Sequence, residues 1–277
     1  MLFLEILKAI ILGIVEGITE WLPVSSTGHM ILVDELMSLN VSPEFMELFL
    51  VVIQLGAICA VPVLFFNKLN PFSAKKSATE RKSTWLLWAK VIVGVMPAAV
   101  IGVLFDDFLD EHLYNFVTVA ITLIVYGIAF IIVEHFKRDK ASRIERVEDL
   151  TFTDALLIGG FQVLSLIPGT SRSGSTILGG RLIGVSRSAS AEFSFFMAIP
   201  VMLGASLLKV AKFVLEGYTA TGTEICLLLV GLVVSFIVSL AAIRFLTDFV
   251  KRHTFTPFGI YRIALGAIVI GYFLITK

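Results

Sequence analysis

Long apolar stretches alternate with short polar ones along most of this 277-residue chain. A helix needs about 20 mostly apolar residues to cross the hydrocarbon core of a bilayer. Six stretches are long enough, at 46–66, 84–105, 113–135, 192–214, 224–246 and 258–276. We therefore predict an all-α integral membrane protein with six transmembrane helices.

Four further apolar segments do not fit a simple crossing. Segment 2–22 carries three carboxylates and stops at Pro23, and 26–37, 153–167 and 173–185 are too short. They form two pairs, each interrupted by Pro, Gly, Ser and Thr, at 23–28 and 168–174. Irregular backbone at membrane depth is tolerated only where protein or a wet cavity surrounds it. Each pair therefore predicts a re-entrant helical hairpin, and function is expected at the two hairpin tips.

The two hairpins repeat each other at a constant offset of 146 residues. The matched pairs are Gly13 with Gly159, Glu16 with Gln162, Thr19 with Ser165, Ser25 with Ser171, Thr27 with Ser173 and Gly28 with Gly174. An odd number of crossings lies between the copies, so the sequence predicts an inverted-topology repeat within one membrane domain, 1–277. The copies are 1–140 and 150–277, and such folds place their sites near the midplane, between broken elements.

Charge is sparse and unevenly distributed. Only 16% of residues are charged and 57% are hydrophobic, which is typical of a membrane protein. Because 22 Lys plus Arg balance 22 Asp plus Glu, the chain has no overall positive charge that would attract nucleic acid. The loops 38–45, 106–112 and 215–223, which share one predicted side of the membrane, contain no Lys or Arg. The loops on the other predicted side are rich in both. Because basic loops stay cytoplasmic, both termini are predicted to be extracytoplasmic. Lys90, Arg244 and Arg262, near helix ends, are expected to snorkel to the interface.

The first tip carries acidic, hydroxyl and imidazole groups. Glu16 and Glu20 share one helix face, and buried carboxylates need a proton, a partner or a cation. They suggest a site for Mg²⁺ or Ca²⁺, or a general-base pair, with a purely structural pair as the alternative. Ser26 becomes a nucleophile only beside a base, which His29 could supply; either Ser25 or Ser26 could equally be a helix N-cap.

The second tip, with Arg172 among small residues, is suited to an anion. Backbone N–H groups at a helix start and a guanidinium both favour phosphate. An arginine inside a membrane hairpin is hard to explain without an anion. Gln54, within a predicted span, either lines the same cavity or bonds to a neighbouring helix.

Two strings in these tips resemble the signature motifs of the undecaprenyl-diphosphate phosphatase family, the bacitracin-resistance type. They are EGITEWLPVSSTGHM at 16–30 and PGTSRSG at 168–174, and EFSF at 192–195 and PFGIYR at 257–262 also fit the family. The resemblance implies a bacterial inner-membrane enzyme that converts undecaprenyl diphosphate to the monophosphate carrier used in peptidoglycan synthesis. It also implies a divalent cation, roles for Glu16, Glu20, Ser26, His29 and Arg172, and a headgroup that enters from the outer face.

Pattern and resemblance together define the predicted site. The phosphates are expected at Arg172 and the N–H groups of Ser173 and Gly174, with Ser171, Ser25 and Thr27 nearby. Ser26 is the candidate nucleophile with His29 as its proton partner, or an activated water takes its place; Glu16 and Glu20 bind the metal, or one is the base. A transporter or flippase of a phosphorylated prenyl lipid is the alternative, because broken helices in inverted repeats are typical of carriers. A non-catalytic scaffold would leave the buried charges unexplained, and the sequence leaves a homodimer open.

Overall fold

The computed structural model describes residues 2–113, 115–138 and 140–276, and most of these residues are helical. The longer helices are α3 (Pro43–Leu64), α5 (Ala78–Leu113), α6 (Phe116–Phe136), α9 (Arg187–Leu215), α10 (Gly222–Arg252) and α11 (Thr256–Thr276). The shorter elements are α1 (Leu2–Thr19), α2 (Ser26–Met37), α4 (Phe66–Leu69), η1 (Val147–Asp149), α7 (Phe152–Val163), η2 (Leu164–Leu166) and α8 (Arg172–Leu182). Within these ranges no β-strand occurs.

Six helices of the described residues are long and apolar enough to cross a membrane. They coincide with the six predicted stretches, which confirms an all-α multi-pass membrane architecture. Several are longer than the apolar pattern indicated: α5 continues to Leu113, so 106–112 is helical, and α10 begins at Gly222. The start of α10 is fixed by a capping box in which Thr221 and Glu224 satisfy each other's backbone N–H groups. In α10 a polar cap therefore extends the helix beyond the apolar residues.

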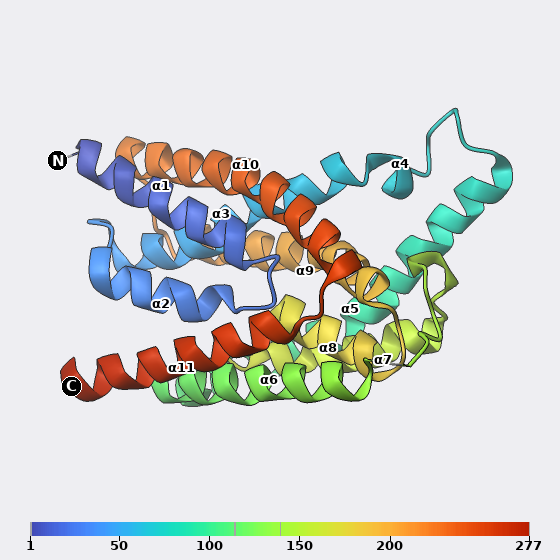
Figure 1. Cartoon of the computed structure of the whole chain (residues 1–277). Coiled ribbons are helices and arrows are strands. Elements are labelled where there is room, and N and C mark those ends of the chain that lie inside the picture. Colours follow the sequence, from blue (N-terminus) through green and yellow to red (C-terminus); the bar gives the residue numbers. More distant parts are fainter. Residues whose placement is uncertain (1, 114, 139, 277) are drawn as a thin grey trace.

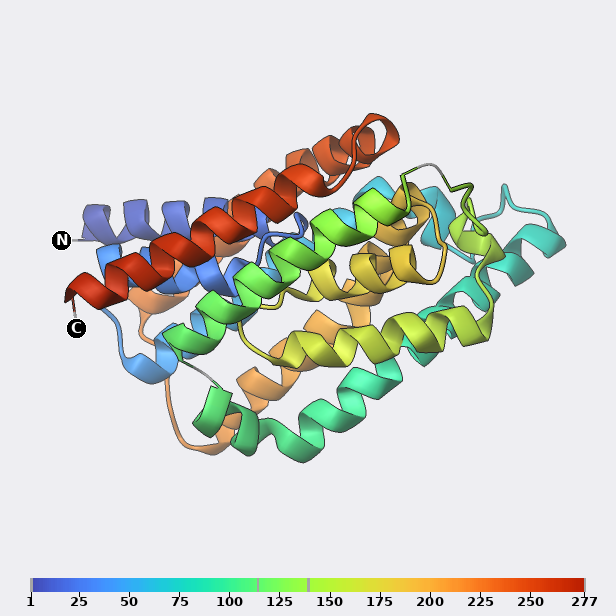
Figure 2. The ribbon, with the colours of Figure 1, turned by 60° about the horizontal axis from the view of Figure 1, so that its bottom comes forward.

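The two pairs of short helices point toward each other in the middle of the molecule. In Figures 1 and 2 the α1–α2 pair opens toward one end of the bundle and α7–α8 toward the other, so that their connecting turns meet between them. The free ends of α1 and α11 lie at the end toward which α1–α2 opens (Figure 1). The re-entrant character of the pairs stays a prediction.

Each short pair packs against a long helix of the other half of the chain. Helix α1 lies along α10, and α7 lies along α5. Glycines at the predicted repeat positions allow both crossings. A Cβ at Gly13 would lie 2.7 Å from the carbonyl oxygen of Gly231, and a Cβ at Gly159 would overlap the carbonyl of Gly94. Close backbone approach therefore requires glycine at both members of this pair, although the repeat boundaries themselves stay a prediction.

Candidate active site

The first tip is a tight turn between α1 and α2. Pro23 prevents the helix from continuing, and Ser25 takes a left-handed backbone conformation with φ of 74°. The Ser25 hydroxyl accepts a hydrogen bond from the N–H of Gly28 at 3.3 Å and so caps α2. Ser25 is fully buried. It therefore shapes the turn, and its N-cap role uses the hydroxyl that we had expected near phosphate.

The second tip has the same local geometry. Ser171 has a φ of 72°, and its hydroxyl accepts from the N–H of Gly174 at 3.1 Å, capping α8. Gly169, with a φ of +84°, passes so close to α6 that a Cβ would lie 2.7 Å from the backbone of Val119. The Gly174 N–H is bonded to the Ser171 cap in this structure, and its role in holding phosphate stays a prediction.

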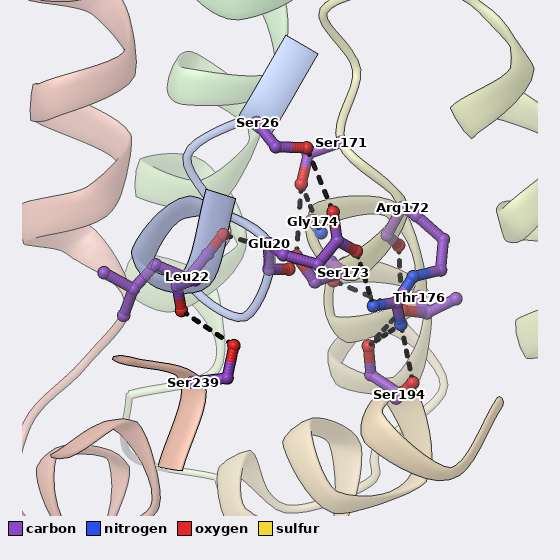
Figure 3. Close-up of polar contacts among 11 residues, drawn as sticks. Glu20, Leu22, Ser26, Ser171, Arg172, Ser173, Gly174, Thr176, Ser194 and Ser239 are labelled. Atoms are coloured by element: carbon purple, nitrogen blue, oxygen red, sulfur yellow. Dashed lines mark hydrogen bonds and ion pairs between the residues drawn. The ribbon is translucent and has the colours of Figure 1, made fainter. Parts of the chain in front are cut away.

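An ion pair joins the two tips. Arg172 Nη2 lies 2.8 Å from Glu20 Oε1, with the arginine side chain 10% and the carboxylate 6% exposed. Arg172 Nη1 also donates to the backbone carbonyl of Ser194 at 2.7 Å. The Ser173 hydroxyl donates to the carbonyl oxygen of Glu20 at 3.0 Å, so it connects the tips and does not face an open phosphate site. Figure 3 shows these side chains pointing toward one another from opposite halves of the chain.

Ser26 bonds to Glu20. Its hydroxyl donates to Glu20 Oε2 at 3.0 Å, while Arg172 holds the other oxygen of the same carboxylate (Figure 3). The carboxylate is therefore oriented by the arginine and presents its free lone pairs to the serine. This arrangement of nucleophile, base and orienting group is typical of an activated hydroxyl.

His29 has different partners from those predicted. Its Nδ1 lies 2.6 Å from the carbonyl oxygen of Ser25, so Nδ1 carries the proton and donates it. Its Nε2 lies 2.7 Å from the Tyr261 hydroxyl, and the two rings stack at 5.6 Å. The pairing of Ser26 with His29 is thus replaced by Ser26 with Glu20 and His29 with Tyr261, because the α2 turn directs the two side chains to different neighbours.

A cavity of about 220 Å³ lies beside this network, between α1, α2 and α3. Its polar lining residues are Glu16, Ser26, Thr27 and Gln54, and its apolar ones are Met30, Ile31, Leu50 and Val51. Gln54 therefore lies in the cavity wall. Glu16 is 1% exposed, and its Oε1 has no hydrogen-bond partner. A buried carboxylate oxygen without a donor is costly unless the group takes up a proton or a ligand meets it.

Oxygen donors at this cavity match the preference of Mg²⁺ and Ca²⁺. No cluster of three or more His, Cys, Asp or Glu occurs among the described residues, so protein carboxylates alone would not fill a coordination shell. Mg²⁺ is commonly held by one or two carboxylates together with substrate phosphates and water. The unpartnered oxygen of Glu16 beside Ser26, Thr27 and Gln54 fits such a site.

Arg262 is the residue whose position differs most from the sequence prediction. It does not snorkel: it is fully buried. Its guanidinium donates to the carbonyls of Pro23 at 3.2 Å, Gly169 at 2.9 Å and Thr170 at 3.0 Å. These carbonyls belong to both tips, so one side chain from α11 holds the two turns together. Oxygens of the turn backbone compensate the buried charge, which is why Arg262 need not reach the interface.

Three residues of the network were therefore missing from the predicted site. Tyr261 and Arg262 lie in the PFGIYR string, and Ser194 lies in EFSF. Both strings carried a signal only through the family resemblance. Nothing in their local pattern indicates a contact with a tip.

Comparison with known proteins places the chain in a family. The family profile described as "Bacitracin resistance protein BacA" matches residues 9–268. The chain belongs to this family.

Relatives with the printed name "Undecaprenyl-diphosphatase" are similar to the chain over almost their whole length. The relative from Enterococcus faecalis (strain ATCC 700802 / V583) is 60% identical, with 99% of each chain covered. That from Acetivibrio thermocellus is 59% identical, covering 99% of this chain and 100% of the relative. That from Streptococcus mutans is 58% identical, covering 98% and 97%. In this BacA-family chain, both signature strings lie at the tips that the Arg172–Glu20 ion pair joins.

Proposed function

We propose that this protein hydrolyses undecaprenyl diphosphate to undecaprenyl phosphate and inorganic phosphate in the bacterial plasma membrane, which returns the lipid carrier to cell-wall synthesis. The observation that carries the proposal is the Ser26–Glu20–Arg172 network, beside a cavity lined by both polar and apolar side chains. The names of relatives about 60% identical over the full chain support the same substrate. All residues of the proposed site come from one chain.

In the proposed reaction Ser26 Oγ attacks the terminal phosphorus. Its proton passes to Glu20 Oε2, and the bond between that phosphorus and the bridging oxygen breaks, releasing undecaprenyl phosphate. Water then cleaves the phosphoserine. Direct attack by a water that Glu20 activates would use the same geometry. General-base assistance of this kind contributes about 10²–10⁴ in rate.

Arg172 is proposed to have two tasks. Its Nη2 orients Glu20, and its buried Nε has no hydrogen-bond partner. That free N–H and the positive charge support a contact with a phosphate oxygen, where charge develops during transfer. Thr27, in the cavity wall, offers a further hydroxyl donor.

A divalent cation would be held by the free oxygen of Glu16, with oxygens of Thr27 or Gln54 adding to its shell. Glu20, whose two oxygens face Arg172 and Ser26, acts as the base and not as a metal ligand. When bound, it supplies positive charge that neutralises the diphosphate and favours the leaving group. The partnerless Oε1 of Glu16 supports this assignment.

The proposed orientation has both termini outside the cytoplasm, with the headgroup admitted from the outer face. The start of α1 and the end of α11 lie at the same end of the bundle (Figure 1), and the loops with Lys and Arg follow the helices that end at the other end. Basic loops favour the cytoplasm. A reporter enzyme that works only outside the cytoplasm is expected to be active when it is fused after residue 277. A reporter that works only in the cytoplasm is expected to be inactive at the same position, and activity of this second fusion would reverse the assignment.

Release of inorganic phosphate by purified protein in dodecyl maltoside, without any gradient, tests the function. An enzyme releases phosphate from undecaprenyl diphosphate in micelles, whereas a transporter or flippase does not. EDTA is expected to abolish release and excess Mg²⁺ or Ca²⁺ to restore it. Full activity after exhaustive chelation would contradict the proposed cation, and Glu20 would then act as a base without a metal.

Ser26→Ala should remove nearly all activity, and Ser38→Ala, at the other end of α2, is the matched control. If Ser26→Ala keeps most of the turnover while the fold is intact, water is the nucleophile. If wild-type protein releases no phosphate under any metal condition, the proposed function is wrong.

A further inference from the structure

A basic recess of about 290 Å³ lies at the end of the bundle away from the α1 and α11 termini. Its cationic lining residues are Lys137, Arg138, Lys140, Arg181, Arg187 and Lys251. The recess is separate from the active site: helix α8 starts with Arg172 at the tip and carries Arg181 near its other end, about 14 Å further along the axis. The proposed hydrolysis uses none of these cations.

Two of the cations form a fixed floor. Arg181 and Arg187 share the buried carboxylate of Glu134 from α6, at 2.9 and 2.7 Å. Arg181 also donates to the carbonyl of Val185 at 2.8 Å. One carboxylate between two guanidinium groups leaves a net positive charge on a rigid surface, and guanidinium forks are suited to phosphate oxygens.

Of the remaining cations, Lys251 pairs with Asp248 at 2.8 Å, whereas Lys137, Arg138 and Lys140 form no ion pair with a carboxylate of the described residues. Arg138 and Lys140 are exposed, and no carboxylate of the described residues pairs with either side chain. The carboxylates that line the recess or bond to its cations are Glu134, Glu145 and Asp248. Asp139 of the same segment lies outside the described residues, and even with its charge added the six cations exceed the carboxylates by two. The recess therefore attracts an anion.

The start of α9 adds a second attraction. Ser186, Arg187 and Ser188 line the recess, and Ser186 caps the 29-residue helix that begins at Arg187. The first N–H groups of a helix have no partner within it, and the helix end carries partial positive charge. Phosphate at such an end is favoured by both effects.

Apolar side chains beside the recess indicate a lipid. Phe136 is 67% and Leu182 is 41% exposed, and Lys137 Nζ donates to the carbonyl of Leu182 at 3.0 Å. The basic rim and an exposed apolar surface are thus adjacent. We propose that this recess binds the phosphodiester headgroup of an anionic phospholipid of the cytoplasmic leaflet, with its acyl chains against Phe136 and Leu182. Basic pockets between transmembrane helices on the cytoplasmic side are suited to such headgroups.

Binding of a fluorescent short-chain phosphatidylglycerol to the full-length protein in dodecyl maltoside tests the site, with phosphatidylcholine as the zwitterionic reference. Arg138→Gln/Lys140→Gln removes two exposed, unpaired cations and leaves the Glu134 cluster intact. Each basic residue near a membrane surface contributes about fivefold in affinity, so the double variant should bind about 25-fold more weakly. Lys75→Gln/Lys82→Gln is the control, because it removes two exposed, unpaired lysines from another basic segment, the loop before α5 and the first turns of that helix.

The expected result is tighter binding of phosphatidylglycerol than of phosphatidylcholine, weakened in the first variant and kept in the control. Equal weakening in both variants would overturn the site in favour of a general attraction by the basic face. Equal affinity for the two lipids, with inorganic phosphate displacing both, would refute the anionic phospholipid as the ligand and indicate a site for free phosphate. A monodisperse peak at the wild-type elution volume in size-exclusion chromatography shows that the first variant is folded, so this test is independent of the proposed hydrolysis.

Discussion

Arg262→Met tests whether one buried side chain holds the two tips in register. Methionine keeps much of the aliphatic volume but removes every donor. The carbonyls of Pro23, Gly169 and Thr170, which now accept from the guanidinium at 2.9 to 3.2 Å, would lose this partner. We expect a folded protein whose tips are displaced relative to each other.

The size of the effect follows from these three carbonyls. A buried polar group left without a partner costs about 1–3 kcal/mol. For the three carbonyls together the loss is about 3–9 kcal/mol. The variant also removes the cost of burying a charge, which offsets part of this loss. We therefore expect the free energy of unfolding to fall by an amount near the lower end of that range, about 3 kcal/mol. Displacement of a catalytic group by about 1 Å lowers rates about 100-fold, so kcat/KM should fall by at least this factor.

Arg244→Met is the matched control. Arg244 also lies in a membrane-spanning helix, but its side chain is exposed. Phosphate release from undecaprenyl diphosphate and thermal unfolding in detergent should both be near wild type for Arg244→Met and both impaired for Arg262→Met. Arg262→Lys should be intermediate, because an ammonium group reaches fewer of the carbonyls. Wild-type kinetics and stability in Arg262→Met would refute the role of this side chain as the link between the tips.

Three further predictions concern the same network and its support. Arg172→Lys keeps the charge but cannot hold Glu20 and Ser194 together, so kcat/KM should fall about tenfold to more than 100-fold; unchanged kinetics would make the ion pair structural. Tyr261→Phe removes the hydroxyl at His29 Nε2 but keeps the stacked ring, and a loss of about two- to tenfold in kcat is expected, whereas no loss would leave Tyr261 as packing. Gly159→Leu should prevent folding because α7 crosses Gly94 there, while Gly160→Leu, which meets nothing within 4 Å, should give monodisperse protein in size-exclusion chromatography; two well-folded variants would contradict the tight crossing.

The sequence alone determined the membrane class, the six long helices and the position of both tips. These features depend on local properties, namely the length of apolar runs and the Pro, Gly and Ser residues that interrupt them. The offset of 146 also correctly paired Ser25 with Ser171, which share an unusual φ and an N-cap role. The sequence also placed Glu16, Glu20 and Ser26 in one region, because these residues are close together along the chain, in α1, the first tip and the start of α2.

Tertiary structure decided which partner each polar side chain has. Ser26 and His29 are three residues apart, yet Ser26 bonds to Glu20 and His29 to Tyr261, 232 positions away. Arg244 and Arg262 look equivalent in sequence, but only Arg262 faces the turn carbonyls, one of them 239 positions distant. Hydrogen bonds are short and directional, so their partners depend on how separate helices pack against each other, and a local pattern of residues does not contain that information.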